Sequence, residues 1–363
     1  MNELISVKKF AVESPELYKL FRDYADQYLA VEKGYKGKTF SQSLSMDEKE
    51  KAINKAFAEE IAKKSGVKAE AYDGDMMHYS ANPMVKSFAD AIEDKMIDMI
   101  IPEVINTSIG LIADISYIDW GDTASFDLEN GSLFEVCQAG FDQKGTVAQE
   151  LTDQTVTVVP TAHQITTRAS LFDILTGRKS LAKYAMKAAL SMQAKIANDA
   201  WAAFATAASQ AVIPTQLYVD TYTDNSAIHL AETVTAWNAG KKAVFAGTPV
   251  ALNQLLPTNA NYRYTLDDAM VRLGYIPQFK NYDVMVTPQF ANYSSSTYGL
   301  TLDDTKIYVV SPASDKLIKV AIGGSMTIPA ETYGNADLTQ EQTIMKSYGV
   351  VAASNAIAGA INI

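Results

Sequence analysis

The pattern of hydrophobic and polar positions predicts one long helix in the middle of the chain. No glycine or proline occurs from Leu181 to about Ala208, and Ser180 stands where a helix cap is expected. Apolar residues recur every three or four positions and form one stripe: Leu181, Ala185, Ala188, Met192, Ile196, Ala200 and Phe204. A polar stripe runs beside it: Lys183, Lys187, Ser191, Lys195 and Asp199. At 1.5 Å per residue this helix is about 40 Å long, which is unusual for a globular domain.

The first 83 residues have a different character. Residues Met46–Ser65 are dense in charge and carry apolar residues at helical spacing, so they predict a helix. Glycines punctuate the rest, and we expect an extended arm with short helices rather than an independent core. A further helix is predicted from Met84 to about Val104, with Asn82 as its cap and Pro102 as its end or kink.

A long β-hairpin is expected between these helices. The stretch Thr155–Ser170 is rich in β-branched residues, and Ile109–Trp120 and Ser132–Gln138 are strand-like. Between them lies an acidic, glycine-bearing segment. Such a hairpin has too little apolar content for its own core, so we expect it to lie on another surface.

From about Ile213 onwards strands alternate with short helices, which predicts a compact α+β or α/β region. The expected helices are Ala227–Trp237, Thr248–Leu256 and Leu266–Leu273. The expected strands are Ala243–Ala246, Asp283–Thr287, Lys306–Ser311, Lys316–Ile322, Ser325–Pro329 and Glu341–Ala352.

Composition excludes several classes of protein. The chain has 363 residues and a formal net charge of −11, so tight binding of nucleic acid over its whole surface is disfavoured. Arginine, the usual reader of bases, is scarce: Arg22, Arg168, Arg178, Arg263 and Arg272. Cys137 is the only cysteine, which excludes an intrachain disulfide and cysteine-rich zinc sites. Neither the amino-terminal residues nor the alanine-rich run Ala200–Val219 has the apolar character of a signal peptide or membrane span.

Motifs that carry chemistry are missing. His78, His163 and His229 are isolated from one another, although Glu232 could share a helical face with His229. Phosphate-binding, dinucleotide-binding and serine-hydrolase signatures do not occur. The acidic pairs Asp267–Asp268 and Asp303–Asp304 are typical of helix caps and solvated turns. We therefore expect no catalytic residue, no cofactor and no metal.

One basic group stands out in this acidic chain, at the start of the long helix. Its members are Arg168, Arg178, Lys179, Lys183 and Lys187. It is either a solvated helix face or a contact surface for an acidic loop of a neighbouring subunit. The acidic candidates are Asp122, Asp127 and Glu129.

The order of these parts resembles the major capsid protein of tailed double-stranded DNA bacteriophages, whose fold is shared with encapsulins and the floor of herpesvirus shells. The strongest match is TVTVVPTAHQITTRASLFDILTG running into SLAKYAMKAALSMQAKIANDAWAAF. Further support comes from KKAVFAGTPVALNQLLP, YDVMVTPQF, KIYVVSPASDKLIKVAIGG and SYGVVAASNAIAGAI. The resemblance covers residues 84–363, and residues 1–83 match only as a long, variable extension.

The resemblance implies an α+β capsid fold with named parts. These are an N-terminal arm (1–83), a peripheral domain (84–120, the spine helix within 169–212, and a return over 317–363), an extended hairpin loop (121–168) and an axial domain (213–316). Relatives often carry a removable scaffolding segment at the amino end, and because this chain begins at Met1 we expect an uncleaved form. Some relatives are crosslinked covalently, but Lys144 at the loop tip has no identifiable partner, so no crosslink is predicted.

The implied function is self-assembly through hexamers and pentamers into an icosahedral shell in the host cytoplasm, around a phage genome. The implied partners are further copies of the chain, a portal, scaffold or decoration proteins, and double-stranded DNA held by weak non-specific proximity, with no membrane. Two alternatives remain open. One is an encapsulin-type compartment, which is usually built from a shorter chain. The other is an α/β enzyme with its site within residues 213–340.

Overall fold

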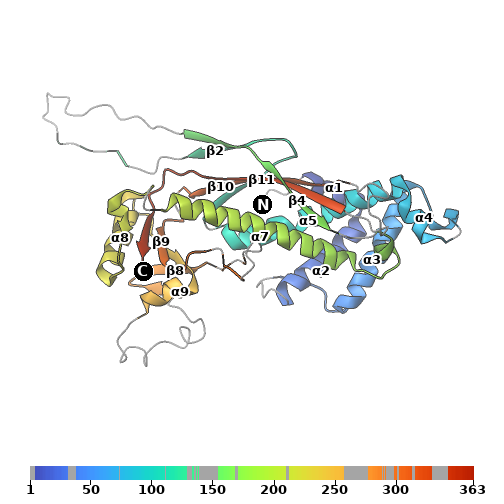
Figure 1. The fold of residues 1–363 in the computed structure, drawn as a ribbon, viewed down its shortest axis with the longest axis horizontal. Helices are drawn as coiled ribbons and strands as arrows, with labels where there is room; N and C mark the ends of the chain where they lie inside the picture. The colour runs from blue at the N-terminus through green and yellow to red at the C-terminus, as the bar shows by residue number, and fades with distance from the viewer. Residues whose placement is uncertain are drawn as a thin grey trace.

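The computed structural model shows an elongated molecule with a helical end, a sheet at the other end and one helix running between them (Figure 1). It describes residues 5–31, 38–72, 74–110, 112–128, 133–134, 136, 138, 154–167, 171–209, 212–256, 277–287, 289, 291, 298–300, 302–312, 315–328 and 342–363. Predictions on Lys144, Cys137, Asp267, Asp268 and the helix Leu266–Leu273 lie outside these residues.

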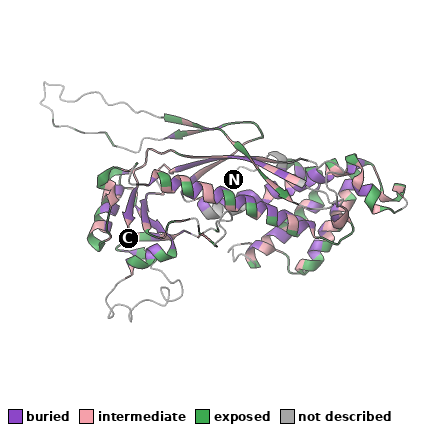
Figure 2. Ribbon diagram, in the orientation of Figure 1, coloured by how far each residue is buried: buried purple, intermediate pink, exposed green. Residues whose placement is uncertain are grey.

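The amino-terminal helices pack together instead of forming an extended arm. They are α1 (Ile5–Glu13), α2 (Pro15–Val31), α3 (Met46–Ser65), η1 (Ala69–Tyr72) and α4 (Met76–Ala81). The predicted helix α3 is confirmed: a capping box of Ser45 and Glu48 begins it, and Gly66 ends it in the left-handed conformation with φ 68°. Apolar residues such as Phe21 and Phe57 are fully buried and join the main core. The segment is compact because its apolar stripes find partners on α5 and α7 (Figure 2).

Two long helices form the centre of that core. Helix α5 (Pro83–Ile109) has Asn82 at its start, where the Asn82 side chain accepts a hydrogen bond from the Met84 amide at 2.9 Å. It continues through Pro102 to Ile109, so Pro102 does not end the helix, and the alternative that Pro102 kinks it stays a prediction. Helix α7 (Leu181–Ala207) follows the short α6 (Leu171–Leu175), and Ser180 caps α7 as predicted. The whole predicted apolar stripe of α7 is buried.

A four-stranded sheet covers these helices in the order β1-β10-β11-β4. Its strands are β1 (Ala113–Tyr117), β10 (Ile318–Ile328), β11 (Gln342–Ala352) and β4 (Thr161–Thr167). β1 runs parallel to β10, and the other pairs are antiparallel. Along β10, Ile318, Val320 and Ile322 face the helices, while Ala321 faces the other way. The two strands expected at 316–329 are one strand with a register shift between Ile322 and Ser325, at Gly323 and Gly324.

The hairpin lies on the outer face of this sheet. β2 (Ala124–Leu128) pairs antiparallel with β3 (Gln154–Val158), with Ala124 opposite Val158. These two residues and Ala321 of β10 form a small core. At Gly349 of β11 an added Cβ would lie 2.9 Å from both Val158 and the carbonyl oxygen of Val159, so only glycine permits this close approach. Residues 161–167 belong to the four-stranded sheet as β4, so the hairpin is shorter than the 121–168 expected.

The second sheet has six strands in the order β5-β12-β9-β6-β8-β7. They are β5 (Tyr218–Val219), β12 (Gly359–Asn362), β9 (Lys306–Val310), β6 (Val244–Gly247), β8 (Tyr282–Val286) and β7 (Gln278–Phe279). Alternation gives each strand two buried faces: Ile307 and Val309 pack with α8 and α9, whereas Tyr308 and Val310 join the core of α7. The covering elements are η2 (Thr215–Leu217), α8 (Asp224–Trp237), α9 (Pro249–Leu252) and η3 (Asn253–Leu255).

The carboxy-terminal residues differ from the expected return to the first sheet. Within residues 317–363, β10 and β11 lie in the first sheet as expected, whereas β12 pairs with β5 and β9 in the second sheet. A four-residue strand among small residues carries too weak a pattern to be assigned from sequence. The predicted α+β fold class is confirmed.

Candidate assembly site

The hairpin exposes apolar side chains to solvent. Beyond β2, Leu133 is 80% exposed, Phe134 57% and Val136 93%. Isolated exposed apolar residues are common, but three within four positions on a projecting segment form a local patch of the kind that binds another protein. We call Leu133, Phe134 and Val136 the hairpin patch.

The base of the hairpin is firmly attached to the first sheet and to Asn355, so its position sets where the outer part of the hairpin begins. Its small core packs on β10, and the Asn355 side chain donates to the carbonyl oxygen of Leu128 at 3.1 Å. On the hairpin itself, the Thr155 hydroxyl donates to the Asp127 carboxylate at 3.1 Å. Among the predicted acidic contacts, Asp122 and Asp127 are exposed there, and Glu129 lies outside the described residues.

The basic group is only partly available for a partner. Lys179 forms an ion pair with Asp173 at 3.2 Å, and Arg178 lies 3.9 Å from the same carboxylate. Lys183 forms an ion pair with Glu50 of α3 at 3.1 Å, and the hydrogen bond to the Glu50 carboxylate raises the pKa of Lys183. Lys187 is exposed on the outer face of α7, and Arg168 lies outside the described residues. Three of the four described members, Arg178, Lys179 and Lys183, thus already face acids of the same chain.

Two lysines buried in the first sheet were not anticipated. Lys346 of β11 is fully buried and its ammonium lies 2.6 Å from Asp98 of α5, which also accepts from the amide and hydroxyl of Ser325. On the opposite face, Lys319 of β10 contacts Asp114 at 2.7 Å and Asp315 at 2.5 Å. In the sequence, Lys319 stands in a largely apolar strand, whereas Lys346 has polar neighbours in β11 and gives no such signal. The Lys346 pair joins the sheet to α5. The Lys319 pairs lie on the opposite face, on which the hairpin rests.

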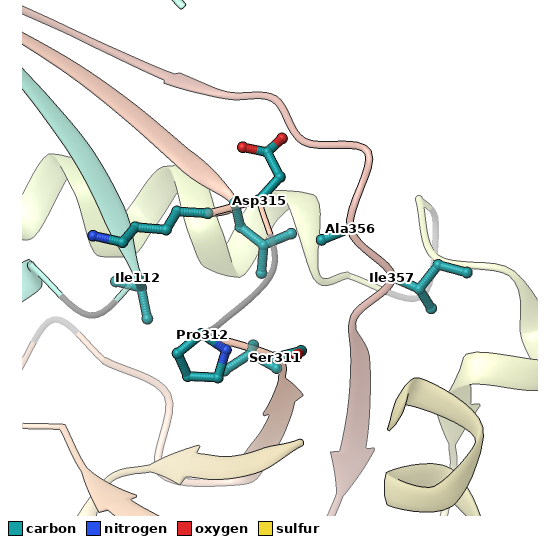
Figure 3. A pocket seen from close by; sticks show the side chains of 9 residues that line it. Ile112, Ser311, Pro312, Asp315, Ala356 and Ile357 are labelled. Carbon is teal, nitrogen blue, oxygen red and sulfur yellow. The ribbon is translucent and has the colours of Figure 1, made fainter. Parts of the chain in front are cut away.

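The two sheets meet at a junction crossed by two stretches of chain. Residues 311–317 lead from β9 to β10, and residues 353–358 lead from β11 to β12. Between them is a cavity of about 10 Å³ lined by Ile112, Ser311, Pro312, Asp315, Ala356 and Ile357, among others (Figure 3). A cavity of this size holds at most about one water molecule, so it is a packing feature and not a substrate pocket.

The other polar candidates have ordinary structural surroundings. His78 lies 2.6 Å from Asp75 at an exposed helix start, and His163 stacks on Tyr348 with ring centroids 3.9 Å apart. His229 and Glu232 are both exposed on α8. Asp303 accepts hydrogen bonds from the amide and hydroxyl of Thr305 in a turn. Within the described part of the chain, no group of three or more potential metal ligands is found.

None of the described helices combines the length and apolarity that a membrane crossing requires.

No protein-family model and no curated protein sequence matches the chain. Solved structures do share its fold. The mature capsid of bacteriophage PhiM1 matches 69% of this chain and 85% of its own, at 11% identity and a TM-score of 0.46. The capsid of the cyanophage P-SCSP1u matches 69% and 86%, at 10% identity and a TM-score of 0.44. A virus-like particle from Pyrococcus furiosus matches 72% and 96%, at 10% identity and a TM-score of 0.40. These three structures are of capsid and particle proteins.

Proposed function

We propose that this chain is the structural subunit of a closed icosahedral shell that encloses a double-stranded DNA phage genome. The observation that carries the proposal is the hairpin patch: Leu133, Phe134 and Val136 are exposed on an element whose base is fixed to the first sheet. A second copy of the chain is the natural partner, because head-to-tail contacts between identical subunits close into rings such as hexamers and pentamers.

Charge supports the same arrangement. The hairpin carries Asp122 and Asp127 at exposed positions, and Lys187 is exposed on α7. Contacts between these residues of neighbouring copies would orient the subunits more than strengthen their association. Arg168, Arg178, Lys179, Lys183 and Glu129 complete the proposed contact set.

The acidic character of the chain fits a container for DNA. A net charge of −11 disfavours tight binding to phosphates, so packaged DNA would be held only by proximity. The partners would be further copies, a portal, and scaffold or decoration proteins, in a particle built in the host cytoplasm. An encapsulin-type compartment would also assemble from identical subunits into a closed shell. Particles that contain protein instead of DNA would support that alternative.

The protein is proposed to have no catalytic role. An α/β enzyme with its site in residues 213–340 would need a pocket and convergent polar groups. The polar candidates described above lie apart: His78 is at a helix start, His163 stacks on Tyr348, and His229 is exposed on α8. Replacing His78, His163 and His229 each by Gln is expected to leave folding and assembly unchanged. A stoichiometric metal found by elemental analysis of the native protein would contradict this.

Deletion of the outer hairpin tests the proposal. Residues Glu129–Leu151 are replaced by a short Gly-Ser turn, which leaves β2, β3 and their packing on the sheet in place. The shortened chain should keep its circular dichroism spectrum but run as monomers or single rings in sedimentation and electron microscopy. A triple variant, Leu133→Ser, Phe134→Ser and Val136→Ser, keeps the length and should show the same defect. Closed particles of normal diameter from both variants would overturn the proposal.

A further inference from the structure

The six residues between β11 and β12 contact three parts of the molecule. They connect the first sheet to the second (Figure 3), and the Asn355 side chain reaches the end of β2 at the base of the hairpin. We call residues 353–358 the crossover segment. What this segment binds on each side determines how the hairpin and the second sheet are oriented relative to each other.

Asp315 binds the crossover segment on the side of the first sheet. Its carboxylate accepts from the Asn355 amide at 3.3 Å, and its carbonyl oxygen accepts from the Ser354 hydroxyl at 3.0 Å. The same carboxylate is 2.5 Å from the buried ammonium of Lys319. Lys319 in turn lies 5.9 Å from the centre of the Phe126 ring of β2. Asp315 is thus shared between the sheet, the crossover segment and, through Lys319, the hairpin.

Asn238 binds the crossover segment on the side of the second sheet. This buried residue follows α8, and its side-chain oxygen accepts from the Ile357 amide at 3.0 Å. Its side-chain nitrogen donates to the carbonyl oxygen of Ile357 at 2.8 Å and to that of Val234 at 2.7 Å. Gly359 then enters β12 so close to α8 that an added Cβ would lie 2.7 Å from Leu230. These contacts fix the path of the crossover segment at this end.

Asn355 connects the crossover segment to the hairpin. Its amide is bound by Asp315, while its side chain donates to the carbonyl oxygen of Leu128, the last residue of β2. Leu128 is the last residue of β2 before the part of the hairpin that carries the exposed patch. A change in the path of the crossover segment therefore moves the point from which the outer hairpin extends.

We propose that Asn355, held by Asp315, is a positioning residue that fixes the direction of the hairpin relative to the second sheet, and so fixes the curvature of the assembled shell. The inference rests on the proposed shell function, and it adds that the second sheet, like the hairpin, contacts neighbouring copies. Two contact surfaces in one subunit build a closed shell of one size only if the angle between them is constant.

The test replaces Asn355 by Ala, which removes the bond to Leu128 and keeps the Asp315–Lys319 pair. The matched control is Asn362→Ala, because Asn362 also donates from its side chain to a backbone oxygen, that of Asp220 at 3.4 Å, but lies in β12 away from the hairpin. Amide hydrogen exchange is measured on the free subunits, and shell diameters are measured by electron microscopy. Asn355→Leu provides a second variant of similar volume in case the alanine chain folds poorly.

The expected result is faster exchange of the β2 and β3 amides in Asn355→Ala by about fivefold, the factor that corresponds to losing one ordinary hydrogen bond. Shells of this variant should be heterogeneous in diameter, whereas Asn362→Ala should match the wild type in both measurements. Unchanged exchange at the hairpin base overturns the inference, and so do uniform shells of normal diameter despite faster exchange. If the wild-type chain itself forms no shells, the shell proposal fails, and the exchange result still decides whether Asn355 holds the hairpin.

Discussion

At the scale of single residues, the lysines in the core are the groups on which the fold depends most. Lys49, Lys319 and Lys346 are all almost completely buried. Each has a carboxylate within ion-pair distance: Asp23 for Lys49, Asp114 and Asp315 for Lys319, and Asp98 for Lys346. Removing charges from water is costly, and an unpaired buried charge costs far more than a paired one. Two of these pairs, Lys319–Asp114 and Lys346–Asp98, therefore join elements that are distant in sequence.

The Lys346–Asp98 pair gives the sharpest test of this. Asp98→Ala leaves the Lys346 ammonium buried without its acid and should lower the free energy of unfolding by about 3–5 kcal/mol. The double variant Asp98→Leu with Lys346→Met should recover part of that loss, because it removes both charges, although the amide and hydroxyl of Ser325 still lose their acceptor. Lys55→Ala, at an exposed pair with Glu59, is the control and should change little. Denaturant unfolding of the wild type and the three variants measures these differences. Equal stability of Asp98→Ala and the wild type would show that the Lys346–Asp98 pair does not stabilise the fold.

A second residue-scale prediction concerns pH. Glu13 at the end of α1 accepts from Lys95 of α5 and Lys64 of α3, both at 3.1 Å, and these bonds lower its pKa below 4.5. A carboxyl whose pKa is lower in the folded chain contributes stability above its unfolded pKa, and this contribution is lost as the pH falls through the folded pKa. Wild type should therefore melt at a higher temperature than Glu13→Gln at pH 7. The difference should shrink below about pH 4.5. A difference that is constant from pH 7 to pH 3 would contradict this assignment.

Residue-scale features were predictable from sequence only where they are local. The caps Ser180 and Asn82 were predicted because a cap and its helix are adjacent in the chain. Lys346 was not recognised, because its partner Asp98 lies 248 positions away. A lysine in a strand ordinarily faces solvent, and only the fold shows that this one faces a helix.

At the scale of elements, α7 behaves as the pattern of its residues predicts. Its apolar stripe is buried against α5, the amino-terminal helices and both sheets, while Lys187, Ser191 and Lys195 stay exposed. Because 27 residues supply seven turns of repeated pattern, no long-range information is needed to assign this helix or its faces.

The two faces of α7 should respond differently to charge. Ile196 is completely buried, so Ile196→Asp places an unpaired carboxylate in the core and should cost several kcal/mol, enough to unfold the domain. Lys187→Glu, on the exposed face, should fold normally and alter assembly at most. Thermal melts of the two variants decide the matter, and equal tolerance at both positions would show the assignment of faces to be wrong.

The elements that sequence placed incorrectly are those fixed by distant partners. The amino-terminal helices were expected to be extended, but Phe10, Phe21 and Leu29 are buried in a core shared with α5 and α7. Residues 161–167 were assigned to the hairpin, but they pair with β11. Strand β12 is short, and its place follows from pairing with β9 rather than from its own residues. The local pattern of residues predicts whether a segment is a helix or a strand better than it predicts which elements the segment packs against.

At the scale of the whole molecule, the distribution of apolar surface is uneven. The helical end, α7 and both sheets share continuous buried cores, as Figure 2 shows. The hairpin has only the small core at its base, and its described outer residues are solvent-exposed. A chain with this arrangement gains stability when neighbours cover the exposed part, so the assembled state should be protected where the free subunit is not.

Limited proteolysis distinguishes those two states. Chymotrypsin cleaves after large apolar and aromatic residues, and Leu133 and Phe134 are exposed on the hairpin of the free subunit. The free chain should therefore be cut at these residues, as at other exposed targets such as Trp237 and Tyr298, while the cores stay resistant because their apolar residues are buried. In purified shells the same bonds should be protected, and cleavage there should require disassembly. Mass spectrometry of the fragments locates the cuts, and Leu133→Ser with Phe134→Ser provides a chain that lacks these targets. Cleavage at Phe134 at the same rate in shells and in free subunits would show that neighbouring copies do not cover the hairpin patch.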